Sequence, residues 1–147
     1  MAARPASGPQ RSPPLDIHTP YTYWVLCHMF GSGCFVALDD EVPVGFVTSV
    51  AEGERALLWQ VGVVPSHRGR GISHLLIDAV AEFSRASRLS TVEFSIDPAN
   101  ANSLGTFGSY ARKHGLPFDR VGEVDLSDEH NPGFREFEDL YAIGLGS

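Results

Sequence analysis

The 147-residue sequence is poor in cysteine, has no long apolar run and carries little positive charge. Its two cysteines, Cys27 and Cys34, form no C-x-x-C pair and are too few for a disulfide scaffold. We expect them to be small core residues, with a reactive thiol as the alternative. No apolar run approaches the ~20 residues that a membrane-spanning helix needs. With 11 basic and 18 acidic residues, the net charge of −7 argues against nucleic acid and anionic membranes as partners.

Familiar nucleotide-binding and metal-binding motifs are absent as well. The sequence has no G-x-x-x-x-G-K-[ST] loop, and no G-x-G-x-x-G follows an apolar strand. Its six histidines include no H-E-x-x-H spacing. We therefore predict neither of these nucleotide-binding sites and no metal site.

The first fourteen residues, MAARPASGPQRSPP, contain four prolines and two arginines but no apolar stretch typical of a secretory signal. This composition predicts a disordered tail over residues 1–14. The apolar content of 43% is enough for one folded domain, which we place over residues 15–147. Cytoplasmic residence follows as the expected location.

Helical and strand-like patterns alternate after this tail. Thr19 and Pro20 are typical of a helix start, and the apolar residues up to Phe30 predict a helix that is buried or walls a pocket. Three strands are predicted next, over residues 34–38, 42–50 and 56–64, with a polar loop over 51–55. The third strand is almost wholly apolar, so we expect it to be buried on both faces.

The second half of the chain continues the alternation. A core-facing stripe predicts an amphipathic helix with Ile72, Leu75, Leu76, Ala79, Val80 and Phe83 on its buried side. Residues 91–96 alternate as a strand, and Asn100 or Asn102 caps a helix that ends near Lys113 or His114. Two last strands are predicted over 121–126 and 140–145. This order indicates an α/β (α+β) fold, a mixed central sheet flanked by helices.

The stretch VGVVPSHRGRGISHLLIDAV, residues 61–80, carries the clearest functional signal. An apolar strand, a turn rich in arginine and glycine, and an amphipathic helix follow one another. Free N–H groups at a helix N-terminus, together with the helix dipole, bind anions such as a pyrophosphate. Gly69 and Gly71 let the backbone approach a ligand, and Arg68 and Arg70 add charge. Taken alone, the Arg-Gly tetrapeptide could equally be a solvated turn.

This stretch resembles the GNAT acyltransferases. Their signature [QR]-x-x-G-x-[GA] matches Arg68-x-x-Gly71, with Ser73 in place of glycine or alanine. The blocks LDIHTPYTYWVLCHMF, GFVTSV, WQVGVVPSHRGRGI, DPANANS, ARKHGLP and FEDLYAIG are similar to the L-2,4-diaminobutyrate acetyltransferases of ectoine synthesis. Together they cover most of the chain from Leu15 to Gly144.

The resemblance implies a GNAT-like fold, acetyl-CoA as donor, and the γ-amine of L-2,4-diaminobutyrate as acceptor. The residues that it assigns to acetyl-CoA are Val61, Val63, Arg68, Gly69, Arg70, Gly71, Ser73 and Asn100. Among these, the backbone of Val61 and Val63 would pair with the pantetheine arm. The amino-acid pocket would contain Asp16, Tyr21, Trp59 and Glu138. The family also suggests a homodimer.

Glu138 is our candidate for holding the γ-ammonium and taking its proton. Asp16 would pair with the α-ammonium, Tyr21 and Trp59 would form amphipathic walls, and a strand amide near Val63 would meet the oxyanion. Each assignment has a plainer alternative. Glu138 could be a solvated strand residue, Asp16 a turn cap, and the two aromatic residues part of the core.

Three features depart from the family pattern. Many GNAT enzymes have a general-acid tyrosine where this chain has Phe107; Tyr110, one turn later, is the candidate substitute or a packing residue. Arg135 and Phe137 stand where the last loop has histidine and proline in the diaminobutyrate enzymes. The strand and helix that precede the Leu-Asp block in that family are not apparent, so we expect either a misassigned start codon or a shortened domain. A GNAT enzyme for another amine, such as a protein N-terminus or an aminoglycoside, and an inactive CoA-binding domain therefore stay open as alternatives.

Overall fold

The computed structural model describes residues 19–131, 133 and 135–146. Within them, six strands form one mixed sheet in the order β1-β2-β3-β4-β6-β5. The strands are β1 (Phe35–Asp39), β2 (Val42–Glu52), β3 (Arg55–Val63), β4 (Thr91–Ile96), β5 (Phe118–Asp125) and β6 (Phe137–Gly144). The helices are α1 (Pro20–Met29), α2 (Ile72–Ala86) and α3 (Ala101–Lys113). The predicted order of helices and strands and the mixed sheet are confirmed. The predicted tail and Asp16 lie outside the described residues.

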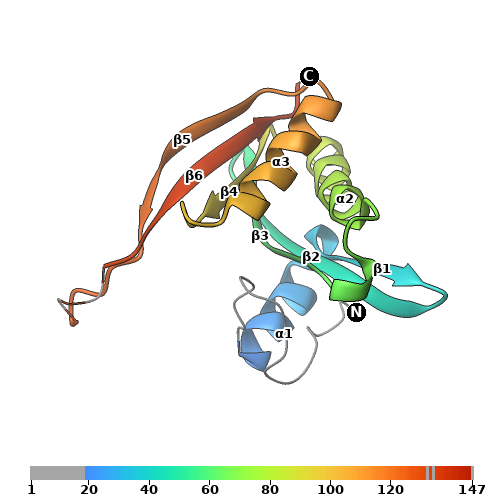
Figure 1. Cartoon of the computed structure of the whole chain (residues 1–147), viewed down its shortest axis with the longest axis horizontal. Coiled ribbons are helices and arrows are strands. Elements are labelled where there is room, and N and C mark those ends of the chain that lie inside the picture. The colour runs from blue at the N-terminus through green and yellow to red at the C-terminus, as the bar shows by residue number, and fades with distance from the viewer. Residues whose placement is uncertain (1–18, 132, 134, 147) are drawn as a thin grey trace.

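Helix α1 lies on one face of the sheet, whereas α2 and α3 cover the other (Figure 1). Thr19 caps α1 as predicted, because its Oγ1 accepts a hydrogen bond from the Thr22 amide at 3.2 Å. The Tyr23 ring packs edge-on against Phe46 of β2. We call the two faces of the sheet the α1 face and the face under α2 and α3, and each strand side chain lies on one or the other.

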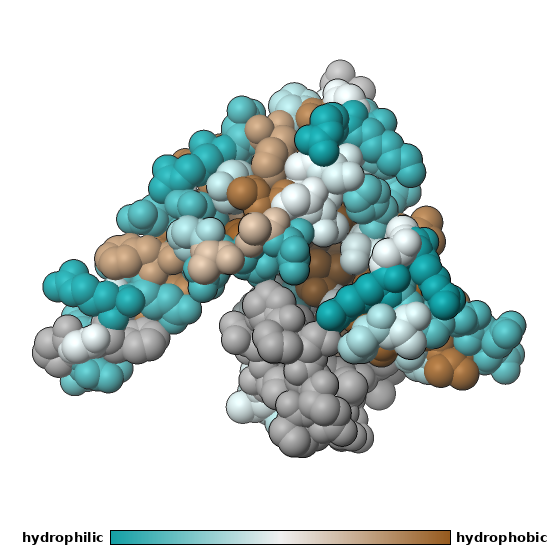
Figure 2. Space-filling view, viewed as in Figure 1, coloured by the Kyte–Doolittle hydropathy of each residue, from teal (hydrophilic) through white to brown (hydrophobic). Residues whose placement is uncertain are grey.

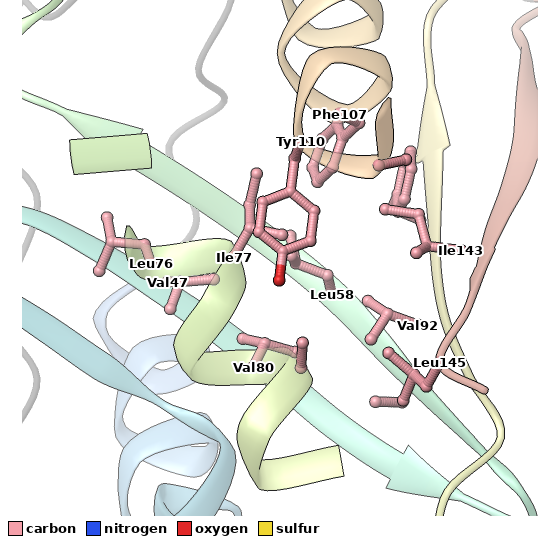
Figure 3. Packing of buried hydrophobic residues seen from close by; sticks show 14 of the residues in the cluster. Val47, Leu58, Leu76, Ile77, Val80, Val92, Phe107, Tyr110, Ile143 and Leu145 are labelled. Atoms are coloured by element: carbon pink, nitrogen blue, oxygen red, sulfur yellow. The ribbon is translucent and has the colours of Figure 1, made fainter. Parts of the chain in front are cut away.

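The core lies between the sheet and helices α2 and α3 (Figure 3). Leu76, Ile77 and Val80 bring α2 onto the strands, each 3% exposed or less. Phe107 of α3 stacks on Phe94 of β4, with ring centroids 3.8 Å apart. These contacts give the domain the helix-on-sheet layering that its apolar periodicity predicts.

Three expectations about burial and boundaries were wrong in detail, and a fourth is narrowed. Strand β3 is not buried on both faces, because Leu57 and Trp59 on its α1 face are 37% and 45% exposed. Helix α1 buries only Tyr23 and Leu26, so of its two predicted roles the wall of a pocket stays a prediction. On α2, Leu75 is 68% exposed instead of facing the core. The polar loop expected over 51–55 is a tight turn, since β2 continues to Glu52 and β3 begins at Arg55.

The hydrophilic residues on the surface agree with this layering. In the view of Figure 2, hydrophilic residues cover most of the β5–β6 hairpin and α2. No helix in the described part of the chain is long and apolar enough to cross a membrane.

The two halves of the sheet separate between β3 and β4. These parallel strands pair over only three positions, from Arg55↔Thr91 to Leu57↔Glu93. Strand β3 runs on to Val63 beside β2, while β4 runs on to Ile96 beside β6. Figure 1 shows the β4–β6–β5 half diverging from the β1–β2–β3 half. The resulting gap opens at the end of β3 where the Arg-Gly turn begins.

Candidate functional site

The turn between β3 and α2 has the backbone that its glycines predict. Gly69 and Gly71 have φ angles of +76° and +80°, a left-handed conformation in which other residues are strained. A Cβ atom built on either glycine meets nothing within 4 Å. The turn therefore presents open backbone to a ligand.

The first turn of α2 keeps its N–H groups available. Gly71 is the N-cap residue and offers no side-chain hydrogen bond to them. The first turn contains no acidic residue, while Arg68 and Arg70 precede it. Helix N-termini leave their first amides without intrahelical partners. The predicted strand, turn and helix are thus confirmed, and the pyrophosphate contact stays a prediction.

Side chains attach this turn to the sheet. The Nε of Arg68 donates to the Val63 carbonyl at 3.2 Å, at the end of β3. His67 lies between Ser66 and Asp39, with 2.8 Å from its Nδ1 to the Ser66 Oγ and 2.7 Å from its Nε2 to an Asp39 oxygen. The turn is consequently joined both to β3 and to the end of β1.

The end of β3 offers its backbone to the gap. The Val64 amide donates to the Val44 carbonyl of β2 at 2.9 Å. Because strand residues alternate in the direction of their N–H groups, Val63 and Val61 direct theirs away from β2 and toward the gap. The Arg68 bond to the Val63 carbonyl agrees with this direction. This is the geometry that backbone pairing with a pantetheine arm needs.

Asn100, rather than Asn102, caps α3. Its Oδ1 accepts from the Ser103 amide at 3.1 Å, and its Nδ2 donates to the Ser103 Oγ at 2.9 Å. Asn100 therefore has a structural role at the start of α3, and its contact with the cofactor stays a prediction.

Trp59 lies at a bulge that turns it toward the α1 face. Thr48 pairs with Gln60 and Ser49 with Leu58, which leaves Trp59 as the extra residue. Leu58 packs in the core under α2, whereas Gln60 bonds to Tyr23 of α1. Trp59 follows Leu58 on the opposite face and is 45% exposed.

Glu138 lies on this same face, on β6, with β4 between it and β3. Its Oε1 accepts a hydrogen bond from the Ser95 Oγ of β4 at 2.7 Å. Among the residues that the structure describes, Ser95 is the only partner of the Glu138 carboxylate. The nearby Glu93, in contrast, forms an ion pair with Arg55 at 3.2 Å. A carboxylate without a countercharge is suited to bind an ammonium group.

Tyr21 lies on the exposed side of α1. It is 72% exposed and stacks on Trp24 at 6.0 Å. Tyr23 and Leu26 hold α1 on the sheet, and helical geometry places Tyr21 on the opposite side from Tyr23. Its role as a pocket wall, like that of Asp16, stays a prediction.

Tyr110 is buried between α2 and α3 (Figure 3). Its hydroxyl donates to the Asp78 Oδ1 of α2 at 2.8 Å. Burial, and then the adjacent Asp78 carboxylate, raise the pKa of Tyr110 well above its usual value. A phenol held in this way is a poor proton donor. The structure favours the packing alternative for Tyr110, and Phe107 is a core residue.

The two cysteines form no disulfide with each other. Cys27 and Cys34 are half-buried free thiols instead of core residues, and burial raises the pKa of Cys34. No group of three or more histidine, cysteine, aspartate or glutamate side chains suited to a metal occurs within the described ranges.

Sequence reasoning missed two polar contacts on the α1 face. The Tyr23 hydroxyl donates to the Gln60 Oε1 at 3.0 Å, and Ser95 bonds to Glu138. Both pairs join residues far apart in the sequence. The sequence contains a signal for the first pair only, because Tyr23 and Gln60 lie next to Tyr21 and Trp59 in the stretches that resemble the diaminobutyrate enzymes.

The chain belongs to the acetyltransferase (GNAT) family, whose model matches residues 7–111. It is 34% identical over 139 residues to the L-2,4-diaminobutyric acid acetyltransferase of Streptomyces anulatus, a match that covers 88% of this chain and 76% of that protein. It is 32% identical over 139 residues to the enzyme of the same name from Halomonas elongata, covering 90% and 70%. Among solved structures it is similar to diaminobutyrate acetyltransferase EctA from Paenibacillus lautus, in complex with L-2,4-diaminobutyric acid and coenzyme A. The TM-score is 0.76 at 28% identity, covering 90% of this chain and 82% of that chain.

Proposed function

We propose that this acetyltransferase moves the acetyl group of acetyl-CoA to the γ-amine of L-2,4-diaminobutyric acid, the acetylation step of ectoine biosynthesis. The observation that carries the proposal is the arrangement at the gap. A glycine-lined helix N-terminus lies at the end of β3, and on β6, across β4, lies the Glu138 carboxylate, which has no countercharge among the described residues. The relatives that share most of the chain are named for this reaction.

The end of β3 and the Arg-Gly turn that follows it would bind acetyl-CoA. The amides of Val61 and Val63 would pair with the pantetheine arm, and residues 68–73 would hold the pyrophosphate through backbone N–H groups and arginine charge. Two left-handed glycines with open space support this assignment. Asn100 would contact the cofactor from the start of α3.

The amino-acid substrate presents a protonated amine that must lose a proton before it can attack. An alkylamine with a pKa of ~10.4 costs about 4–5 kcal/mol to deprotonate at pH 7. Glu138 would bind the γ-ammonium and take this proton, directly or through water. The neutral nitrogen then attacks the acetyl carbonyl and the C–S bond breaks. Coenzyme A leaves as a thiolate, which takes up the second proton that the nitrogen loses as the amide forms, and Glu138 returns the first proton to solvent. A strand amide near Val63 would donate to the oxyanion.

The remaining pocket assignments follow from the family resemblance. Asp16 would bind the α-ammonium, while Trp59 and Tyr21 would provide amphipathic walls. The exposure of Trp59 on the Glu138 face supports its part.

We further propose that the enzyme works as a homodimer in the cytoplasm, as a single domain over residues 15–147. The family resemblance supports the dimer. The net charge of −7 supports a cationic small molecule, rather than nucleic acid or an anionic membrane, as the partner.

A panel of amines tests the substrate. With acetyl-CoA saturating, we expect kcat/KM for L-2,4-diaminobutyric acid to exceed that for ornithine, lysine, an aminoglycoside and a peptide N-terminus by at least about tenfold. Release of the CoA thiol is the measurement. A higher kcat/KM for any other member of the panel would contradict the proposed substrate.

A further inference from the structure

Ser95 lies in the part of β4 that borders the gap. The last residue pair between β3 and β4 is Leu57↔Glu93, two residues before Ser95. On its other side, β4 continues to pair with β6 as far as Ile96↔Asp139. Ser95 is therefore fixed by β6 while it faces the region where the sheet opens.

The side chain of Ser95 points to the same face as Glu138. Phe94 and Ile96, its neighbours in the strand, are 1% and 5% exposed in the core under the helices. Because strand side chains alternate, Ser95 lies on the opposite face and is exposed to solvent. It pairs directly with Leu140, which shares a face with Glu138 two residues earlier.

The hydrogen bond between Ser95 and Glu138 is short, and it engages only one of the two oxygens of the carboxylate. The Ser95 Oγ donates to the Glu138 Oε1 at 2.7 Å, a length typical of a hydroxyl bound to a carboxylate. This bond fixes one oxygen and leaves the second free for a cation. A glutamate side chain has several rotatable bonds, so holding it in one orientation removes an entropic cost from substrate binding.

Glu93 on β4 provides a comparison for Glu138 on β6. Glu93 lies on the same face and accepts from the Thr91 hydroxyl at 3.4 Å, but its charge is met by Arg55 at 3.2 Å. Among the described residues, Glu138 has a hydroxyl partner and no guanidinium partner. Ser95 thus orients the carboxylate without neutralising it.

We propose that Ser95 is a positioning residue for acetyl transfer, which holds the Glu138 Oε1 so that the Oε2 can receive the proton of the substrate ammonium. This inference rests on the proposed function. In this proposal the Ser95 hydroxyl contributes to the rate of acetyl transfer by orienting the Glu138 carboxylate.

Five variants of the full-length chain test this role. We expect Ser95→Ala to lower kcat with L-2,4-diaminobutyric acid by about tenfold while the KM for acetyl-CoA and the melting temperature stay unchanged. Ser95→Thr keeps the hydroxyl and should retain kcat within about threefold. Thr91→Ala, which removes a hydroxyl from the paired Glu93, is the matched control and should keep full activity. The double variant Ser95→Ala/Glu138→Gln should be no slower than Glu138→Gln alone, because Ser95 acts through Glu138.

The outcomes separate this inference from the proposed function. If Glu138→Gln is slow but Ser95→Ala retains normal kcat, the role of Ser95 is wrong and the proposed function stands. Equal losses in Ser95→Ala and Ser95→Thr, or additive losses in the double variant, would also overturn it. If the unmodified protein does not acetylate L-2,4-diaminobutyric acid, both fall together.

Discussion

At the scale of single residues, two acids on neighbouring strands differ in what meets their charge. The Arg55 guanidinium binds Glu93, whereas Glu138 has only the Ser95 hydroxyl among described residues. A partly exposed ion pair of this kind adds little stability, but it balances the charge of the Glu93 carboxylate. Glu138 remains able to bind a cation, which is what a diammonium substrate offers.

Replacing Glu138 by glutamine removes the charge and the proton acceptor while it keeps the shape. We expect Glu138→Gln to lower kcat at neutral pH by about 100-fold or more. Glu123→Gln on the adjacent strand, where the lost partner is the exposed Arg120 at 3.7 Å, is the control and should stay close to normal. Steady-state rates measure both, and a near-normal rate for Glu138→Gln would remove Glu138 from the mechanism.

Tyr110→Phe tests packing against proton donation. Because the pKa of Tyr110 is raised by burial and then by Asp78, the folded state favours the neutral phenol. Its contribution to stability is present below the ordinary tyrosine pKa of ~10 and is lost as the pH rises above that value. We expect Tyr110→Phe to destabilise the fold by about 1–2 kcal/mol at neutral pH and to flatten the loss of stability above pH ~10. A fall in kcat of more than about tenfold would instead support the general-acid role.

At the scale of elements, the junction of β3 and α2 combines a strand end, two left-handed glycines and an uncapped helix N-terminus. The bonds of Arg68 to Val63 and of His67 to Asp39 hold this junction on the sheet. The open backbone can therefore meet a ligand without first being ordered. Such preorganisation lowers the cost of binding.

Gly71→Leu tests the junction, and Gly53→Leu provides its control. Both glycines have positive φ angles and open space around a built Cβ, but Gly53 lies in the β2–β3 turn. Each substitution should cost about 1–2 kcal/mol of stability through left-handed strain. Only Gly71→Leu should abolish acetyl-CoA binding in calorimetry. Unchanged affinity in Gly71→Leu, or equal loss in both variants, would contradict the placement of the pyrophosphate.

At the scale of the whole molecule, β3 and β4 pair over only three positions and then separate, which divides the sheet into two halves. Local patterns predicted most of the framework: the apolar stripe of α2, the Thr19 cap and the glycine turn each depend on residues close in sequence. The burial of β3 was misjudged because an apolar strand with one exposed face has the same composition as a strand buried on both faces.

The contacts across the sheet could not be predicted in this way. The pairs Tyr23–Gln60 and Ser95–Glu138 join residues 37 and 43 positions apart. The first pair depends on how α1 packs on β3, and the second on the strand order, which places β6 rather than β5 beside β4. Hydroxyl and amide side chains on strands have no periodic signature, so their partners become visible only once the fold is known.

The most direct test of the account is to identify the product formed by the purified chain from acetyl-CoA and L-2,4-diaminobutyric acid. We expect release of one CoA thiol for each molecule of amino acid consumed, and NMR should show the new acetyl group on the γ-nitrogen. Acetylation at the α-nitrogen, or no turnover by folded protein that binds acetyl-CoA, would contradict it.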